Sequence, residues 1–206
     1  KDGLSNDQVF SLSQMNDGTI LVGTLAGLNK IDNNFRVSVA NEIKMNENIA
    51  YWSILQNGKN DFYFGTFAEG LLNFDFSKNA KKLYTATNGL TNSQIVSLLK
   101  DREGNLWVGT VSGIYKYYNN KFIYYYKSNG LLDNYINKIG VDVFDNVWLS
   151  IANNGLAKID GNSIINYKAE FGKKNTLPDN NINVIMPLNN GTVYFGTDEG
   201  LCVFED

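Results

Sequence analysis

The chain reads Ile95-Val96-Ser97-Leu98 and then Gly104-Asn105-Leu106-Trp107-Val108-Gly109-Thr110, two apolar runs joined by a short polar turn. Four other segments repeat this pattern, at residues 9–24, 51–66, 136–151 and 182–197. In every copy the first apolar residue precedes the Gly-Thr site by 14 positions, with no gap. The glycine positions, with serine in the fourth copy, are Gly23, Gly65, Gly109, Ser150 and Gly196, spaced by 42, 44, 41 and 46 residues. This period is typical of β-propeller blades.

Each repeat predicts four short strands separated by turns. In the third repeat we expect strands at 95–100, 105–110, 113–118 and 122–126, because β-branched and aromatic runs are broken there by Gly, Asn and Asp. The second strand is apolar at consecutive positions, as in Leu106-Trp107-Val108, which predicts burial on both faces. The repeat therefore predicts an all-β protein in which each blade is packed between two others.

We expect a single β-propeller region over residues 1–206. Its five four-stranded blade repeats span about 1–42, 43–86, 87–127, 128–173 and 174–206. The last repeat stops after its third strand, and the first offers no spare strand to complete it. This pattern indicates an arc of blades from a larger ring, and a closed five-bladed ring is the alternative.

Composition excludes several functions. The 206 residues include no histidine, which removes Ser-His-Asp catalysis and His-ligated metal sites. A net charge of −3 without a basic stripe argues against nucleic-acid binding. No apolar run approaches the roughly 20 residues of a membrane span, so we expect no membrane insertion by this segment. The single cysteine, Cys202, is expected in a core, and we expect neither a metal nor a cofactor.

The repeat resembles the two-component regulator propeller repeat. The resemblance rests on Gly89-Leu90-Thr91-Asn92-Ser93-Gln94-Ile95, on the Gly104–Thr110 stretch quoted above and on Gly113-Ile114-Tyr115-Lys116-Tyr117. It covers essentially the whole chain. The weakest copy is the second, where Met45-Asn46 stands in place of Gly-Leu, and the fourth departs at Ser150-Ile151.

The resemblance implies a role in signalling. In that family the repeats form periplasmic sensor regions of membrane-anchored hybrid histidine kinases, commonly as pairs of seven-bladed propellers, and many members respond to oligosaccharides. It therefore implies a periplasmic sensor whose partners are a small glycan ligand, the remaining blades of a seven-bladed ring and a second copy in a homodimer. The repeat motif itself fixes no ligand residue.

Candidate ligand residues come from the loops that open on one end of the blades. These are the entry loops before each first strand and the loops between second and third strands. Planar polar groups and aromatic rings bind sugars, through hydrogen bonds and apolar ring faces. The candidates that meet this description are Phe67, Glu69, Tyr135, Asn153, Asn154, Asp198 and Glu199.

Two other functions stay open. A glycosidase needs two carboxylates converging on a pocket, about 5–10 Å apart. No Asp or Glu lies in the apolar part of a first strand, and Asp142, at the far end of its strand, comes nearest. We therefore expect no catalytic residue, with a five-bladed hydrolase or lyase as one alternative and a protein-interaction or dimerisation scaffold as the other.

Overall fold

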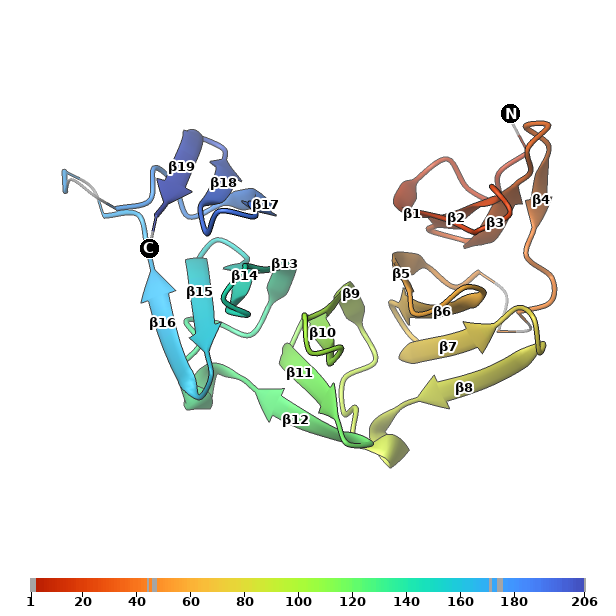
Figure 1. Cartoon of the computed structure of the whole chain (residues 1–206), viewed down its shortest axis with the longest axis horizontal. Helices are drawn as coiled ribbons and strands as arrows, with labels where there is room; N and C mark the ends of the chain where they lie inside the picture. Colours follow the sequence, from red (N-terminus) through yellow and green to blue (C-terminus); the bar gives the residue numbers. More distant parts are fainter. Residues whose placement is uncertain (1–2, 44, 46–47, 171, 174–175, 206) are drawn as a thin grey trace. The chain divides into compact units, whose positions relative to one another are not determined.

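The computed structural model describes residues 3–43, 45, 48–170, 172–173 and 176–205. These residues form five antiparallel sheets and two single turns of 3₁₀-helix, and the described part contains no α-helix (Figure 1). The all-β fold class and the five blade repeats are thereby confirmed. Among the helices of the described residues, none is long and apolar enough to cross a membrane.

Two compact units, residues 1–98 and 99–206, divide the chain, and each is described by itself. The first unit contains two complete sheets. Its first sheet is β1 (Val9–Gln14), β2 (Ile20–Thr24), β3 (Gly27–Ile31) and β4 (Val37–Val39). Its second sheet is β5 (Tyr51–Gln56), β6 (Asp61–Thr66), β7 (Leu71–Asp75) and β8 (Ala80–Tyr84), followed by η1 (Ala86–Asn88). Each sheet is a meander in which every strand pairs with its neighbours in sequence.

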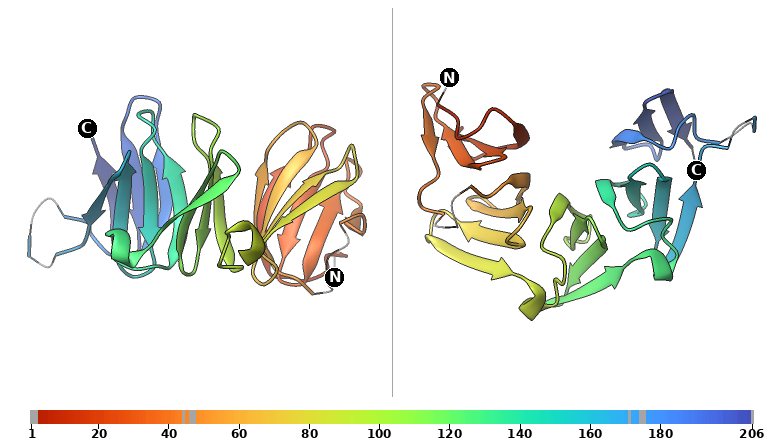
Figure 2. Two further views of the ribbon diagram at one scale, coloured as in Figure 1. Left: turned by 90° about the horizontal axis from the view of Figure 1, so that it is seen from below. Right: turned by 180° about the vertical axis from the view of Figure 1, so that it is seen from behind.

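The remaining sheets lie in the second unit, except that β9 (Ile95–Lys100) begins in the first. The third sheet adds β10 (Leu106–Thr110), β11 (Gly113–Tyr118) and β12 (Lys121–Tyr125) to β9, and η2 (Lys127–Asn129) follows. The fourth is β13 (Ile136–Val141), β14 (Val147–Ile151), β15 (Gly155–Asp160) and β16 (Ser163–Tyr167). The three-stranded fifth is β17 (Ile182–Pro187), β18 (Val193–Thr197) and β19 (Gly200–Phe204). Figure 2 shows the meanders from two further sides.

Side-chain burial follows the expected pattern. All residues of β10 and β14 are buried, as continuous apolarity predicted. Trp107 packs in a cluster with Ile136, Val147 and Leu149 of the fourth blade, and Trp148 packs with Val193 and Phe195 of the fifth. In the first unit, Leu21 and Leu28 share a core with Phe62 and Phe64 of the second blade. The repeated second strands therefore supply the cores between successive blades.

The glycine before each third strand is required by backbone geometry. All five have positive φ, between 85° and 136°: Gly27, Gly70, Gly113, Gly155 and Gly200. At Gly113 a Cβ atom would also lie 2.6 Å from the Tyr124 ring. The neighbouring threonine supports this turn, since Thr110 Oγ1 donates to the Gly113 carbonyl at 2.9 Å. Any residue with a Cβ would be strained at these positions.

The glycine of the Gly-Thr site has a different role, at the contact between blades. Gly23 pairs with Ser11 and faces Tyr51, the first residue of the next blade's first strand. A Cβ atom there would collide with the Ser11 hydroxyl and the Tyr51 carbonyl oxygen. The Ser11 hydroxyl donates to that carbonyl at 3.1 Å. Glycine thus allows one blade's second strand to approach the next blade's backbone closely.

The fourth blade reaches the same hydrogen bond from another strand. Ser150 occupies the glycine position and Lys138, its direct partner in β13, occupies the position of Ser11. Ser150 Oγ donates at 3.0 Å to the carbonyl of Ile182, which begins the next blade's first strand. The hydroxyl has moved from the first strand to the second. This exchange explains why the fourth copy departs from the Gly-Thr pattern.

This exchange predicts energetic coupling between the paired positions. Gly23→Ser alone should lower the free energy of unfolding by about 1–3 kcal/mol, because it crowds a filled contact. Ser11→Ala alone should cost about 1 kcal/mol through the lost hydrogen bond. The double variant should lose clearly less than the sum, since the new hydroxyl can reach the Tyr51 carbonyl. Chemical denaturation of the four proteins measures the cycle, and strictly additive losses would contradict it.

Candidate functional site

A β-bulge recurs at one place in the first strands. The pairing register shifts between Val9 and Ser11 in β1, and at the equivalent place in β5, β13 and β17. The extra, unpaired residues are Phe10, Trp52, Asn137 and Asn183. A bulge leaves one residue outside the ladder and re-aims its side chain, which is why bulges are frequent beside active sites. Four of the blades thus present a variable side chain at an otherwise fixed position.

Backbone hydrogen bonds place two loops beside each bulge. The entry loop precedes the first strand, and the loop between the second and third strands is here called the 2–3 loop. In four blades the first N–H of the 2–3 loop donates to the last carbonyl of the entry loop. The pairs are Leu25 to Gln8 (3.0 Å), Phe67 to Ala50 (3.1 Å), Ala152 to Tyr135 (3.0 Å) and Asp198 to Asn181 (3.3 Å). The bulge, the entry loop and the 2–3 loop therefore meet at one end of each of these four blades.

In the fourth and fifth blades this end is polar. A cavity of about 130 Å³ is lined by Asn137, Ser150, Ile151, Ala152, Asn153, Asn181, Ile182, Asn183 and Asp198. The Asp198 carboxylate accepts hydrogen bonds from Asn181 Nδ2 at 3.1 Å and from the bulge residue Asn183 Nδ2 at 2.6 Å. Because a carboxylate and amides can accept and donate together, this cluster, the amide pocket, suits a ligand rich in hydroxyl groups.

In the first and second blades the same end is aromatic. The two bulge residues stack on each other, with Phe10 and Trp52 ring centroids 5.0 Å apart and planes at 25°. Phe67 of the 2–3 loop stacks on Trp52 at 4.4 Å and 17°. These three rings, the aromatic stack, come from three separate segments. Phe67 also lines a cavity of about 500 Å³ with Leu25, Ala26, Asn48, Ile49, Ala50, Ala68 and Glu69.

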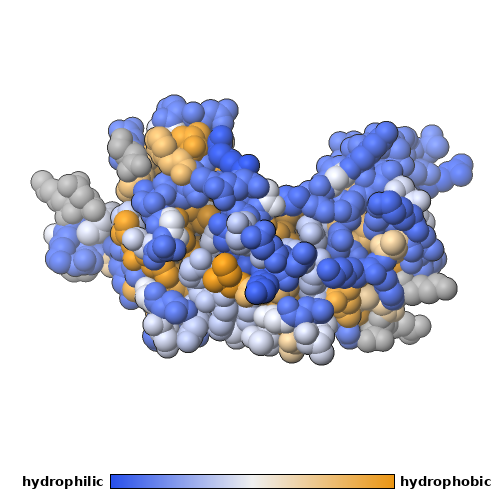
Figure 3. Space-filling view, turned by 60° about the horizontal axis from the view of Figure 1, so that its bottom comes forward, coloured by the Kyte–Doolittle hydropathy of each residue, from blue (hydrophilic) through white to orange (hydrophobic). Residues whose placement is uncertain are grey.

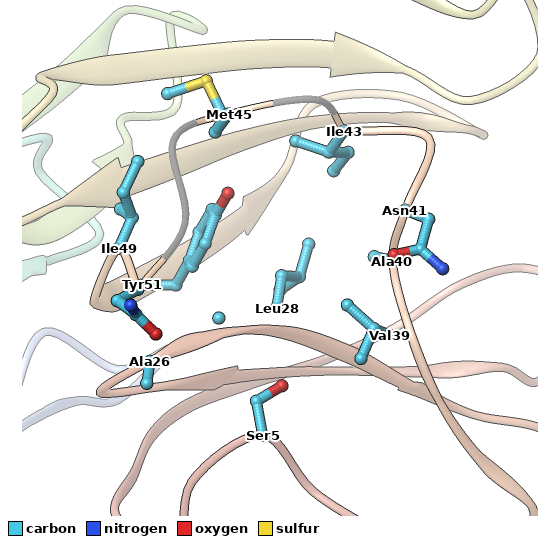
Figure 4. A pocket seen from close by; sticks show the side chains of 12 residues that line it. Ser5, Ala26, Leu28, Val39, Ala40, Asn41, Ile43, Met45, Ile49 and Tyr51 are labelled. Atoms are coloured by element: carbon cyan, nitrogen blue, oxygen red, sulfur yellow. The ribbon is translucent and has the colours of Figure 1, made fainter.

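A second cavity of about 500 Å³ lies next to it in the first unit and shares Ala26, Asn48 and Ile49 with it. Figure 4 shows its largely apolar lining around the Tyr51 ring. Burial, with a smaller contribution from the Glu69 carboxylate, raises the pKa of Tyr51 to about 12. Tyr51 is 4% exposed and therefore stays a neutral hydroxyl at physiological pH.

The buried carboxylates belong to the scaffold. Asp142 accepts from Trp148 Nε1 at 2.8 Å, from Asn146 Nδ2 at 3.0 Å and from the backbone N–H groups of Phe144 and Asn146 at 3.0 Å. Asp101 repeats the arrangement in the third blade, with Trp107 Nε1 at 2.8 Å and Asn105. Each carboxylate thus holds a tryptophan and a turn in place, and both are oriented toward protein donors.

Three acidic groups in the second unit, Asp101, Glu103 and Asp145, have carboxylate oxygens within 4.8 Å of one another. Protein donors already occupy them. Glu103 accepts from Asn105 Nδ2 at 3.0 Å, and Asp145 accepts from the backbone N–H of Arg102 at 3.0 Å. Lys116 Nζ lies 3.7 Å from Asp101. This cluster is explained as a brace between turns.

The structure does not bring all of the predicted site residues to one cavity. Phe67 and Glu69 line one cavity in the first unit, and Asn153 and Asp198 line the amide pocket in the second. Asn154 is engaged in its own turn, where its Nδ2 donates to the Ala152 carbonyl at 3.1 Å.

The other two predicted residues lie outside the amide pocket as lined above. Tyr135 is half-buried and contributes its carbonyl to the 2–3 loop. Glu199 is exposed, and its N–H donates to Thr197 Oγ1 at 3.2 Å.

Sequence reasoning missed the four bulge residues. The available signal was variability, because the second position of the first strand reads Phe10, Trp52, Val96, Asn137 and Asn183 while the position before it stays apolar or aromatic. In the sequence alone these positions look like ordinary strand residues.

Repeated blades with variable loop ends define a propeller-type repeat protein. The family "Two component regulator propeller" matches residues 89–112, which lie in the third repeat and include its Gly109-Thr110 site. The match confirms the resemblance predicted from the repeat motif. No curated protein sequence matches the chain.

Solved structures share the fold. The chain is similar to the extracellular domains of the putative hybrid two component systems BT3049 and BT4673 from B. thetaiotaomicron, with TM-scores of 0.83 and 0.77 and 20% identity to each. The alignments cover 99% and 98% of this chain but only 29% and 28% of those chains. It is also similar to virginiamycin B lyase from Staphylococcus aureus, at a TM-score of 0.69 and 14% identity, covering 100% of this chain and 71% of the lyase.

The buried carboxylate network predicts a loss of stability when its acceptor is changed. Asp142→Asn places an amide against the donors of Trp148 and Asn146, so unfolding free energy should fall by roughly 2–4 kcal/mol. Asp145→Asn is the matched control, because Asp145 has a φ of 67°, which asparagine also accepts. Thermal and urea unfolding measure both variants. Equal stability of the two variants would contradict the structural role.

Proposed function

We propose that this chain is the ligand-sensing propeller of an extracytoplasmic, periplasmic region of a two-component signalling protein. It binds a glycan fragment and passes the signal to a histidine kinase. The matched repeat and the fold shared with extracellular domains of two hybrid two component systems support the sensor role. The glycan part of the proposal rests on the chemistry of the loop ends.

The amide pocket is the observation that carries the proposal. Asp198 is fixed by Asn181 and Asn183, while Asn137 and Asn153 add two further amides to the lining. Sugar hydroxyls both donate and accept hydrogen bonds, so a carboxylate surrounded by amides offers matching partners. Since two of these residues occupy bulge positions, the ligand chemistry can vary without disturbing the blade.

A binding role is favoured over a catalytic one. The buried carboxylates Asp101 and Asp142 are saturated with protein donors, and Asp198 is held by amides without a second acid among the residues lining the amide pocket. A His-to-Ala variant of the lyase that shares this fold is described as catalytically inactive, and this chain has no histidine. These observations support a non-catalytic sensor.

A further blade is proposed as a partner of the fifth blade. The residue after the third-strand glycine is at most 3% exposed in four blades, as at Ile114 and Leu156, but its equivalent Leu201 is 66% exposed. Val184, Met186 and Val203 are exposed on the same face of the fifth sheet. Apolar side chains also interrupt the hydrophilic surface in Figure 3. In the first, third and fourth blades this face packs against the following blade, which is the kind of occupant we propose here.

Signal transfer requires two arrangements with different ligand affinity. We propose that the glycan favours one relative placement of propellers in a homodimer, and that this placement is transmitted to the kinase. A ligand can shift such an equilibrium only by its differential affinity for the two states.

The function is tested by thermal shift of the complete extracytoplasmic region against a panel of glycan fragments, with product analysis of each well. A ligand at about 100 times its Kd should stabilise the protein by about 2.7 kcal/mol, and the sugar should be recovered intact. Asp198→Asn and Asn183→Ala should each weaken binding. Asp160→Asn, the same charge change at an exposed strand end, should bind as the wild type. Recovery of cleaved sugar would overturn the proposal in favour of an enzyme.

If a further blade covers this face of the fifth sheet, a charge at Leu201 should destabilise the protein. In the complete region, Leu201→Arg should lower the melting temperature by several degrees, because it places a charge between packed blades. Ile165→Arg is the control, since Ile165 is 42% exposed on β16, the outer strand of its sheet. A Leu201→Arg protein as stable as the control would show that no blade covers this face.

A further inference from the structure

The aromatic stack occupies positions that folding alone does not require to be aromatic. Phe10 and Trp52 are bulge residues, and the same bulge is built with Asn137 and Asn183 in the fourth and fifth blades. The blade therefore forms with an amide at this position as well as with a ring. Three nearly parallel rings at the loop end are a specific addition to the repeat.

The stack also carries an energetic cost. Trp52 Nε1 is buried, and among the described residues it has no hydrogen-bond partner. The other two indole N–H groups, on Trp107 and Trp148, each donate to a buried aspartate at 2.8 Å. Leaving a buried donor unpaired costs about 1–3 kcal/mol, and an exception of this kind in a folded protein calls for a reason.

One end of the stack is open. The Phe10 side chain is 41% exposed, and Leu25 beside the first-blade bulge is also 41% exposed. At the other end, Phe67 lines the cavity that contains the Asn48 amide and the Glu69 carboxylate. Ring surface and hydrogen-bonding groups therefore lie in one part of the first unit.

This combination matches the two faces of a pyranose. A pyranose with mostly equatorial hydroxyls presents a patch of C–H groups that packs on an aromatic ring, while its edge donates and accepts hydrogen bonds. A furanose offers no comparable flat patch. A carboxylate at the site disfavours anionic sugars, because like charges repel.

We propose that Phe10, Trp52 and Phe67 form an aromatic subsite for neutral pyranose units of the glycan. One unit packs on the exposed ring of Phe10, and Glu69 and Asn48, at the Phe67 end of the stack, bond hydroxyls of a further unit of the same glycan. This subsite rests on the proposed function and narrows its ligand class to neutral, equatorial pyranosides. The exposed ring of Phe10 supplies the contact surface. Trp52, between the other two rings, holds them parallel and reports on binding.

Intrinsic tryptophan fluorescence tests the subsite in the complete extracytoplasmic region. Titration with neutral β-linked gluco-oligosaccharides should change the emission of the wild type, and fructo-oligosaccharides or polygalacturonate fragments should not. Trp52→Phe should abolish the change in emission while calorimetry still detects binding. Phe10→Ala should weaken the affinity roughly tenfold, about 1.4 kcal/mol, and Phe10→Tyr should restore it. Tyr118→Ala, which removes a 49% exposed ring on β11, is the matched control.

The outcomes separate the subsite from the function. Loss of binding in Phe10→Ala, with melting temperature and the Tyr118→Ala control unchanged, supports the subsite. If Phe10→Ala and Glu69→Gln bind a glycan as the wild type does while Asn183→Ala does not, the subsite is wrong and the proposed function stands. If fructo-oligosaccharides or anionic fragments bind and gluco-oligosaccharides do not, the subsite is overturned. If no glycan binds, both proposals fail.

Discussion

The approach of each second strand to the next blade's first strand is the contact on which the repeat depends. At Gly23 and Gly65 the missing Cβ leaves room for the neighbouring backbone or side chain, and at Gly65 a Cβ would lie 2.6 Å from Ile95. Close packing there brings the apolar second strands into shared cores. At Ser150 the contact is filled instead by a hydroxyl from the second strand, which bonds the Ile182 carbonyl, so the residue type at this position is not fixed.

A scaffold constrained in this way separates structural from variable positions. Asp101 and Asp142 bond Trp107 and Trp148 inside the blades and are unavailable to a ligand. The bulge stands outside the ladder, so its side chain can vary without changing the strand pairing. Aromatic residues in the first unit and asparagines in the second can therefore occupy one position of the same fold. Binding specificity can change at the loop ends while stability is maintained elsewhere.

The fold was predictable because its signals are local and repeated. The strands of the third repeat were expected at 95–100, 105–110, 113–118 and 122–126, and the structure has them within one residue. The site was predictable only in part. Phe67 and Asp198 lie in loops that can be located from their turn-forming residues. The bulge depends instead on the pairing register between two strands, which the sequence of one strand does not show. Trp52 follows Tyr51 as any strand residue would, and only its missing pairing partner distinguishes it.

The departures from the repeat were visible in the sequence, but their causes were not. Ser150-Ile151 breaks the Gly-Thr pattern. Nothing in the neighbouring sequence shows that the residue paired with Ser150 is Lys138, where the first blade has a serine. In the 2–3 loop that follows, Asn153 adopts a φ of 57° and Asn154 Nδ2 donates to the Ala152 carbonyl. One asparagine is thereby committed to the turn, and the other is left lining the amide pocket. The turn geometry of this loop thus distinguishes two adjacent asparagines that look alike in the sequence.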